Sequence, residues 1–136
     1  MSSYLFGWNP DIWPWNEMAQ DRSNVIASQT VTYDWQCANS HAQPGDLAWI
    51  MRYGSGITAK GIVAKGIITS VPFPAHHPTV PQKMTPHVTI KITEIRPEVV
   101  PFSALEHAYS AQTWNPRQSG IQIKSEAVLR LELLWQ

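Results

Sequence analysis

The sequence is poor in charged residues and holds a single cysteine. Only 15% of its 136 residues are Asp, Glu, Lys or Arg, and ten basic residues balance ten acidic ones. A formal net charge of zero argues against a strongly basic nucleic-acid-binding protein. With Cys37 alone, the chain can form neither an internal disulfide nor a cysteine-based zinc cluster. Both absences are typical of a protein from a reducing compartment.

The sequence also lacks long apolar segments. No run reaches the length of about 18 apolar residues that a membrane-spanning helix needs. The first residues, Met1-Ser2-Ser3, carry no charged flank ahead of an apolar core. We therefore expect neither a membrane span nor a secretory signal, and we expect a cytoplasmic protein.

Candidates for catalysis or metal binding are few. Cys37 follows an expected strand without a glycine-rich elbow, so we interpret it as a small packed side chain rather than a nucleophile. The adjacent pair His76-His77 has no Asp, Glu or Cys nearby to complete a metal site. The stretch Gly54-Ser55-Gly56 lacks the lysine and hydroxyl pair of a phosphate-binding loop. We therefore expect no enzymatic activity, no metal and no cofactor.

Charge is distributed unevenly along the chain. Residues 1–46 hold five acidic residues against one arginine, a balance of −4, whereas residues 47–96 hold six basic residues against Glu94, a balance of +5. A basic segment of this kind can lie along a phosphate backbone, and Lys60, Lys65 and Lys83 are the candidate contacts. The alternative is an ordinary solvated strand face.

Strands dominate the expected secondary structure, because eleven prolines and seven tryptophans favour turns and strands over long helices. Apolar runs and alternations predict strands at 2–8, 31–35, 47–53, 61–70 and 87–95. Residues 47–51 are apolar on both faces, so their strand should lie centrally in the sheet. Gly61 and Gly66 within one strand indicate a bulge or bend of the kind that a small barrel needs.

Helices should be short and peripheral. Asn16 is a plausible N-cap for a helix that the polar residues 21–24 would end. Ser103 and Glu106 have the spacing of a capping box, and Ser125 precedes an apolar stripe that ends at Trp135. Five prolines between 71 and 86 predict a long, stiff surface loop. We predict one α+β domain, residues 1–136, with a twisted, mostly antiparallel β-barrel and peripheral helices.

The tryptophans are the clearest functional signal, since four of the seven fall in the first third of the chain beside asparagine and proline. Aromatic rings mixed with amides at strand ends suit a pocket for a planar, hydrogen-bonding ring such as a nucleobase. Trp49 and Trp135 should be core, and Trp15 mainly core, whereas Trp8 and Trp35 are candidate pocket walls. The candidate base-binding residues are Trp8, Asn9, Pro10, Trp13, Trp35, Cys37, Asn39, Arg52 and Tyr53.

Short motifs in this order resemble those of EVE domains of the PUA-like superfamily, and in particular the N-terminal EVE-like domain fused to HNH nucleases in modification-dependent restriction systems. The motifs are Trp8-Asn9-Pro10, Trp13-Pro14-Trp15, 35–39 (WQCAN), 44–46 (PGD), 52–54 (RYG), 61–66 (GIVAKG), 70–72 (SVP), 114–116 (WNP), 119–121 (SGI) and the closing Leu134-Trp135. The chain departs from that pattern at Tyr53, where relatives usually have glutamine, and at His76-His77, where many have a His-Trp pair.

The resemblance implies a PUA-like (EVE/YTH/ASCH-like) fold and a reader that flips 5-methylcytosine or 5-hydroxymethylcytosine in DNA into an aromatic pocket. It further implies a restriction or defence setting in which a separate nuclease acts as partner. Two alternatives remain open: an RNA-binding module that reads modified RNA, and a small amidohydrolase acting on modified nucleosides, for which Lys60 or Lys65 near Asp46 would be the candidate groups.

Overall fold

The computed structural model describes residues 1–53 and 60–136, so the Gly54-Ser55-Gly56 segment lies outside the described residues. Within these ranges the chain forms strands and helices in an order close to the one predicted. The elements are β1 (Ser3–Trp8), α1 (Met18–Ile26), β2 (Thr32–Gln36), β3 (Leu47–Arg52), β4 (Gly61–Ile68), β5 (Phe73–His76), β6 (Met84–Pro101), α2 (Phe102–Ala108), β7 (Ile121–Gln122) and α3 (Ser125–Trp135).

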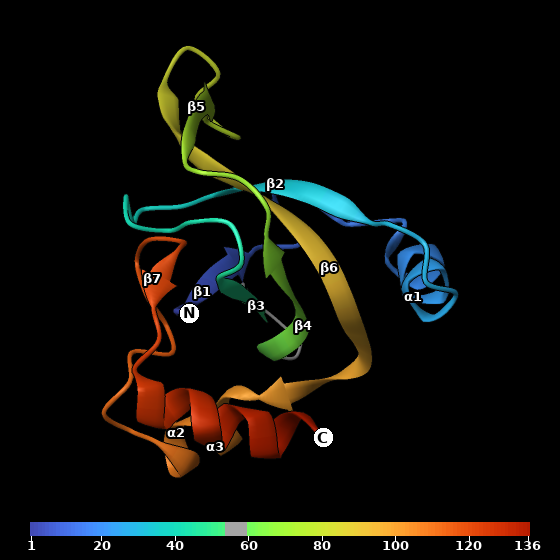
Figure 1. Cartoon of the computed structure of the whole chain (residues 1–136), viewed down its shortest axis with the longest axis vertical. Helices are drawn as coiled ribbons and strands as arrows, with labels where there is room; N and C mark the ends of the chain where they lie inside the picture. The colour runs from blue at the N-terminus through green and yellow to red at the C-terminus, as the bar shows by residue number, and fades with distance from the viewer. Residues whose placement is uncertain (54–59) are drawn as a thin grey trace.

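The strands form one curled, mixed sheet in the order β2-β6-β4-β3-β1-β7, with β5 paired to β6 (Figure 1). Only the β1–β3 pair is parallel among the pairs that the described strands make. Strand β3 lies between β4 and β1, as its two-sided apolar run predicts. The predicted α+β architecture is confirmed as a half-barrel that β6 makes by bending along its 18 residues.

Bulges allow this curl. The register between β4 and β6 shifts between Ile62 and Ala64 and again between Lys65 and Gly66. A Cβ on Gly66 would lie 2.4 Å from the Lys91 carbonyl oxygen, so only glycine lets the two backbones approach this closely. The bend predicted for the glycine-containing strand is therefore present.

The two edges of the sheet, β2 and β7, meet where the chain leaves β2 and where it enters β7. The Ala38 amide donates to the Ser119 carbonyl (2.8 Å), and the Gly120 amide donates to the Leu5 carbonyl (2.8 Å). Gly120 has a φ of +86°, and a Cβ there would lie 2.6 Å from Cys37 Cα. A glycine at position 120 thus lets the chain ends of the sheet close on each other.

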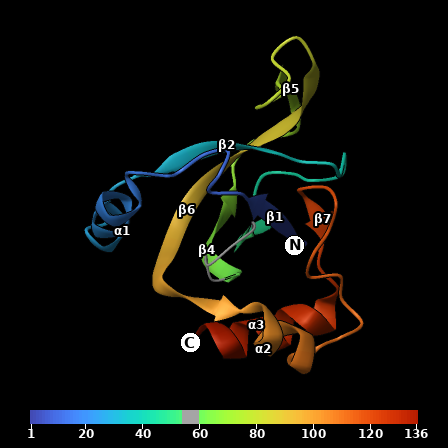
Figure 2. The same cartoon turned by 180° about the vertical axis from the view of Figure 1, so that it is seen from behind.

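Two hydrophobic cores result, one on each side of the sheet. The first fills the curl and holds Trp8, Trp15 and Trp35. The second lies beneath α2 and α3, which pack together at one end of the molecule (Figure 2), and it holds Trp49, Trp114 and Trp135. The predicted core placement of Trp15, Trp49 and Trp135 is confirmed by their burial.

Three secondary-structure predictions were wrong. Glu17 rather than Asn16 precedes α1, and no side chain caps this helix. The polar residues 21–24 continue α1 instead of ending it, because Asp21 turns inward and is buried. Residues 71–86 form a β5–β6 hairpin in place of the predicted loop, since several of their prolines lie where the backbone amide is not needed for pairing. Helices α2 and α3 are present as predicted, but no side chain caps them.

Candidate functional site

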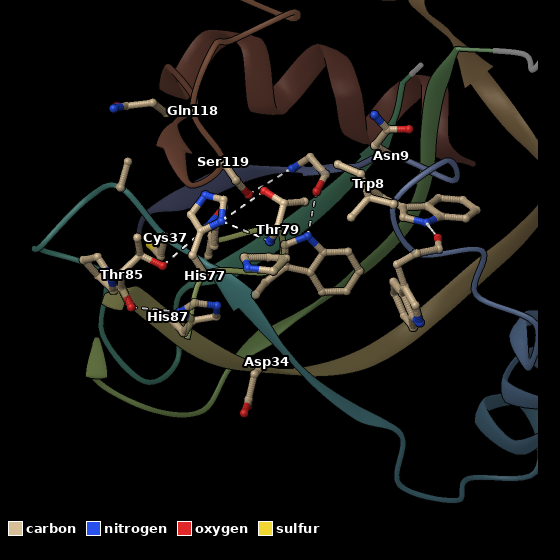
Figure 3. Close-up of a pocket in the computed structure, with 18 of the residues that line it drawn as sticks. Trp8, Asn9, Asp34, Cys37, His77, Thr79, Thr85, His87, Gln118 and Ser119 are labelled. Carbon is tan, nitrogen blue, oxygen red and sulfur yellow. Dashed lines mark hydrogen bonds between the residues drawn. The ribbon is translucent and has the colours of Figure 1, made fainter. Parts of the chain in front are cut away.

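A cavity of about 650 Å³ opens where β1 and β2 end (Figure 3). Its lining comes from the end of β1 and the following loop, from β2, from Tyr53, from the β5–β6 hairpin and from residues 117–119. This volume falls within the range of roughly 300–1,000 Å³ that is usual for small-molecule sites. Segments far apart in the sequence therefore meet around one concave surface.

One wall of the cavity belongs to a cluster of aromatic rings, which we call the cavity cluster: Trp8, Trp13, Trp15, Tyr33 and Trp35. Trp13 stacks on Trp15, with ring centroids 5.1 Å apart, and meets Trp35 edge-on at 5.6 Å. Apart from the deeply buried Trp15, every member of the cluster lines the cavity. The cluster is thus a packed aromatic wall.

Hydrogen bonds fix the orientation of these rings. Trp8 Nε1 donates to the Trp13 carbonyl, and Trp35 Nε1 donates to the Gly7 carbonyl, each at 2.7 Å. The second bond links β2 to the end of β1 across the mouth of the curl. Because both donors are satisfied internally, a ligand would meet the faces and edges of these rings rather than their N–H groups.

A buried carboxylate anchors the cluster to α1. Asp21 Oδ2 accepts hydrogen bonds from Trp15 Nε1 (2.8 Å) and from the Tyr33 hydroxyl. Burial, followed by the contact with Asp21, raises the pKa of Tyr33 from 10.0 to about 12. Tyr33 therefore stays protonated and keeps donating to Asp21 over the physiological pH range.

Asn9, Cys37 and Tyr53 also line the cavity, as predicted for base-binding residues. Asn9 Oδ1 accepts from the Asp11 amide (2.9 Å), which fixes the turn after β1. Cys37 is only 1% exposed, and burial raises the pKa of its thiol. This confirms the interpretation of Cys37 as a packed side chain and gives no sign of an activated nucleophile.

Other predicted pocket residues lie outside the lining. Asn39 Oδ1 accepts from the His41 amide (2.8 Å) and so stabilises a local turn. Arg52 places its guanidinium carbon 5.9 Å from the centre of the Trp8 ring. Pro10 is half-buried in the loop after β1.

The three candidate phosphate contacts lie in different surroundings. Lys83 is exposed and lines the cavity, together with the exposed Arg117. Lys60, by contrast, lies 4.0 Å from the centre of the Phe102 ring, and Lys65 pairs with Glu94 (3.2 Å) and Glu132 (3.4 Å). Of the three predicted phosphate contacts, only Lys83 is at the cavity.

Sequence reasoning missed His77, His87 and Arg117, all of which line the cavity. For His77 a signal existed, because the pair His76-His77 stands where the resemblance to EVE domains predicts a His-Trp pair. His77 Nδ1 accepts from the Thr79 and Val80 amides, both at 3.1 Å. His87 Nδ1 lies 2.9 Å from the Thr85 carbonyl oxygen. The hairpin thus brings two fixed imidazoles to the cavity.

The groups suggested for a hydrolase are engaged in other contacts. Asp46 is buried and accepts from the Ser2 and Gln43 amides, each at 3.1 Å. Lys65 is held by Glu94 and Glu132 beside α3. In residues 1–53 and 60–136, no three His, Cys, Asp or Glu side chains gather as metal ligands do, and no helix there is long and apolar enough to cross a membrane.

Comparison with known proteins yields structural neighbours only. No protein-family model matches the sequence, and no curated protein sequence matches it. A protein from Pseudomonas syringae is similar at 13% identity with a TM-score of 0.68, over 99% of this chain and 100% of the other. A hypothetical protein from Leishmania major is similar at 12% identity with a TM-score of 0.67, over 99% and 95%.

A third solved structure is that of human THYN1 protein in complex with DNA that contains 5-methylcytosine. It is 13% identical, with a TM-score of 0.64, and the match covers 100% of this chain and 99% of the other. At these identities the likeness concerns the fold. The chain shares with these solved structures an α+β fold, a curled mixed sheet with peripheral helices.

Proposed function

We propose that this chain is a DNA-binding reader domain, residues 1–136, that takes a flipped modified cytosine into the cavity. The single observation that carries the proposal is the aromatic-walled cavity at the ends of β1 and β2. The bases in question are 5-methylcytosine and 5-hydroxymethylcytosine. The cavity is open to solvent, so a base can enter from outside.

The energetics of base flipping suit such a wall. Extruding a base from the duplex costs a few kcal/mol in lost stacking and pairing, and a stacking contact with an aromatic side chain restores about 1–3 kcal/mol per base. Trp8, Trp13, Trp35 and Tyr53 are rings of the lining that can make this contact. A methyl or hydroxymethyl group adds apolar area or a hydrogen-bonding group for the pocket to recognise.

Cations on the rim support a nucleic-acid partner. Lys83 from the hairpin and Arg117 from the segment before β7 both line the cavity, where they can contact the phosphates next to a flipped nucleotide. Because only a few cations gather there, we expect modest affinity for plain DNA and a weak dependence on salt compared with strongly basic proteins.

The fold likeness to human THYN1 protein, solved with DNA containing 5-methylcytosine, supports the same reading. The restriction setting rests on the resemblance to EVE domains of nuclease fusions, with a separate nuclease as the proposed effector. In this proposal the domain binds and does not catalyse, since the suggested Lys–Asp pair is not assembled.

Matched duplexes test the proposal. Fluorescence anisotropy with otherwise identical duplexes carrying cytosine, 5-methylcytosine or 5-hydroxymethylcytosine at one position should show tighter binding to at least one modified duplex, by about tenfold. Equal Kd values for all three in moderate salt would contradict the proposal. Competition with the matching RNA should displace the DNA poorly; efficient displacement would instead favour the RNA-reading alternative.

A further inference from the structure

The β5–β6 hairpin presents two imidazoles to the cavity in opposite tautomers. A neutral imidazole carries one N–H donor and one acceptor nitrogen, and the partner of one nitrogen fixes the role of the other. In this hairpin both Nδ1 atoms contact backbone groups, which can only donate or only accept. The tautomers therefore follow from the backbone geometry.

His77 is fixed with its proton on Nε2. Its Nδ1 accepts from two backbone amides, those of Thr79 and Val80, each at 3.1 Å. A backbone N–H can only donate, so Nδ1 must carry a lone pair. The side chain closes the turn at the hairpin tip in the way that an aspartate or asparagine closes an Asx turn. Nε2 of His77 is then a donor.

His87 is fixed the opposite way. Its Nδ1 lies 2.9 Å from the Thr85 carbonyl oxygen, which can only accept, so the proton resides on Nδ1 and Nε2 is an acceptor. The side chain is 6% exposed, and its ring lies 6.4 Å from that of Phe73. Throughout the described part of the chain, no group is recorded as donating to His87 Nε2.

Among the described residues, Trp49 Nε1 is the fully buried side-chain nitrogen or oxygen without a hydrogen-bond partner, so His87 Nε2 keeps some solvent access, and water or a ligand can donate to it. His87 lines the cavity, so a ligand there can supply the donor. The register pairs His87 with Gln36, the residue after Trp35 in β2. Since successive strand residues point to opposite faces, His87 lies on the other face of the pair from Trp35. Its imidazole therefore lines the cavity next to the aromatic wall and is not part of that wall.

From this arrangement we infer that His87 Nε2 accepts a hydrogen bond from the exocyclic amino group of the flipped base, so that the site selects amino bases over keto bases. The inference rests on the proposed reader function and names what the reader selects. Cytosine and adenine carry an amino group at this edge, whereas thymine and uracil carry a carbonyl oxygen. An oxygen facing His87 Nε2 would leave two acceptors opposed and unbonded.

The tautomers can be measured directly in the free protein. Two-dimensional ¹⁵N–¹H spectra of the histidine side chains at pH 8 should show His87 as the Nδ1–H tautomer and His77 as the Nε2–H tautomer. Addition of a duplex with 5-methylcytosine should shift the His87 Nε2 resonance. A proton on His87 Nε2 in the free protein, or an unchanged Nε2 resonance in the complex, would overturn the inference.

Thymine is a matched probe for binding, because it shares the 5-methyl group of 5-methylcytosine and differs at position 4 and in the N3 proton. We expect the wild type to bind the 5-methylcytosine duplex about tenfold or more tightly than the same duplex with thymine opposite guanine. The mismatched thymine is easier to flip, so this preference must come from the pocket. Equal binding, or tighter binding of thymine, would overturn the inference.

Variants separate the inference from the proposed function. His87→Phe keeps a flat ring against Phe73 but removes the acceptor, and His87→Gln offers an amide that can present either a donor or an acceptor. Both should bring the preference for 5-methylcytosine over thymine close to one. His107→Phe, an exposed change on α2, is the control. If folded His87 variants keep the wild-type ratio of Kd values for thymine and 5-methylcytosine duplexes, the inference is wrong. If they also keep the wild-type preference for 5-methylcytosine over cytosine, the proposed function is unaffected.

Discussion

Two groups of tryptophans in this chain are buried to a similar extent but differ in what lies beside them. Trp8 and Trp35 of the cavity cluster are 5% and 8% exposed, and Trp49 and Trp135 beneath the helices are 0% and 6% exposed. We call Trp49, Trp114 and Trp135 the helix-side cluster. Only the first group borders the cavity. Burial alone therefore does not distinguish a pocket wall from a core residue.

One ring of the helix-side cluster also differs in how its indole N–H group is held. In the cavity cluster, Trp8, Trp15 and Trp35 each donate to a carbonyl or a carboxylate. Within the helix-side cluster, Trp114 and Trp135 donate their indole N–H groups to the Tyr109 carbonyl and to Glu94, so Trp49 is the ring of that cluster that differs from the cavity cluster. Trp49 Nε1 is buried with no acceptor among the described residues, and Lys65 lies 5.1 Å from the centre of its ring. The rings beside the cavity are oriented by polar contacts, whereas Trp49 is held by packing.

The largest effect should come from the helix-side cluster. Trp49→Ala removes a fully buried indole and should lower the free energy of unfolding by about 3–5 kcal/mol, as measured by urea denaturation. What remains folded should keep the wild-type preference for modified DNA, because Trp49 does not reach the cavity. A Trp49→Ala variant with the wild-type free energy of unfolding would contradict this prediction. So would a folded variant that loses the preference for modified DNA.

A smaller effect is expected on the salt dependence of DNA binding, and it should differ between Lys83 and Lys65, which were both predicted from the sequence to be phosphate contacts. Lys83→Ala should weaken binding to all duplexes and lower the slope of log Kd against log salt by about 0.9. Lys65→Ala should leave that slope unchanged, because Lys65 pairs with Glu94 and Glu132. Salt titrations of both variants measure the slopes, and equal slopes would show that the rim is not where phosphates bind.

The smallest effect concerns pH and the link between the cavity cluster and α1. The pKa of Tyr33 is raised to about 12 in the fold, so the unfolded chain loses this proton first as pH rises. The stability that Tyr33 provides is therefore full below pH 10 and is lost between about pH 10 and pH 12. Tyr33→Phe should flatten this part of the curve of unfolding free energy against pH; an unchanged curve would contradict the assignment.

Local patterns were enough to predict much of the fold. Alternation and glycine placement gave the strands and the bend near Gly66, and the apolar run at 47–51 gave the central position of β3. The β5–β6 hairpin was missed because proline content suggests a loop, whereas an edge strand tolerates proline where no amide is required. The length of α1 was missed because the buried partner of Asp21 lies outside the helix.

The candidate site was predicted only in part, because local patterns do not show which distant segments meet in the fold. Trp8, Trp13, Trp35 and Tyr53 line the cavity as predicted, because strand ends and turns are visible in the sequence. His87 and Arg117 come from distant segments that the curl brings together, and no local pattern marks them. Asn39 was placed in the pocket on its closeness to Trp35, but its amide closes a turn with His41.

The central claim is that the cavity cluster, and not the helix-side cluster, reads the base. Trp35→Ala and Trp135→Ala form a matched pair, since each removes a similarly buried ring with one hydrogen-bonded N–H. The ratio of Kd values for cytosine and 5-methylcytosine duplexes, measured on both folded variants, tests it most directly. We expect the ratio to fall to about one in Trp35→Ala alone; a folded Trp35→Ala variant with the wild-type ratio would contradict the claim.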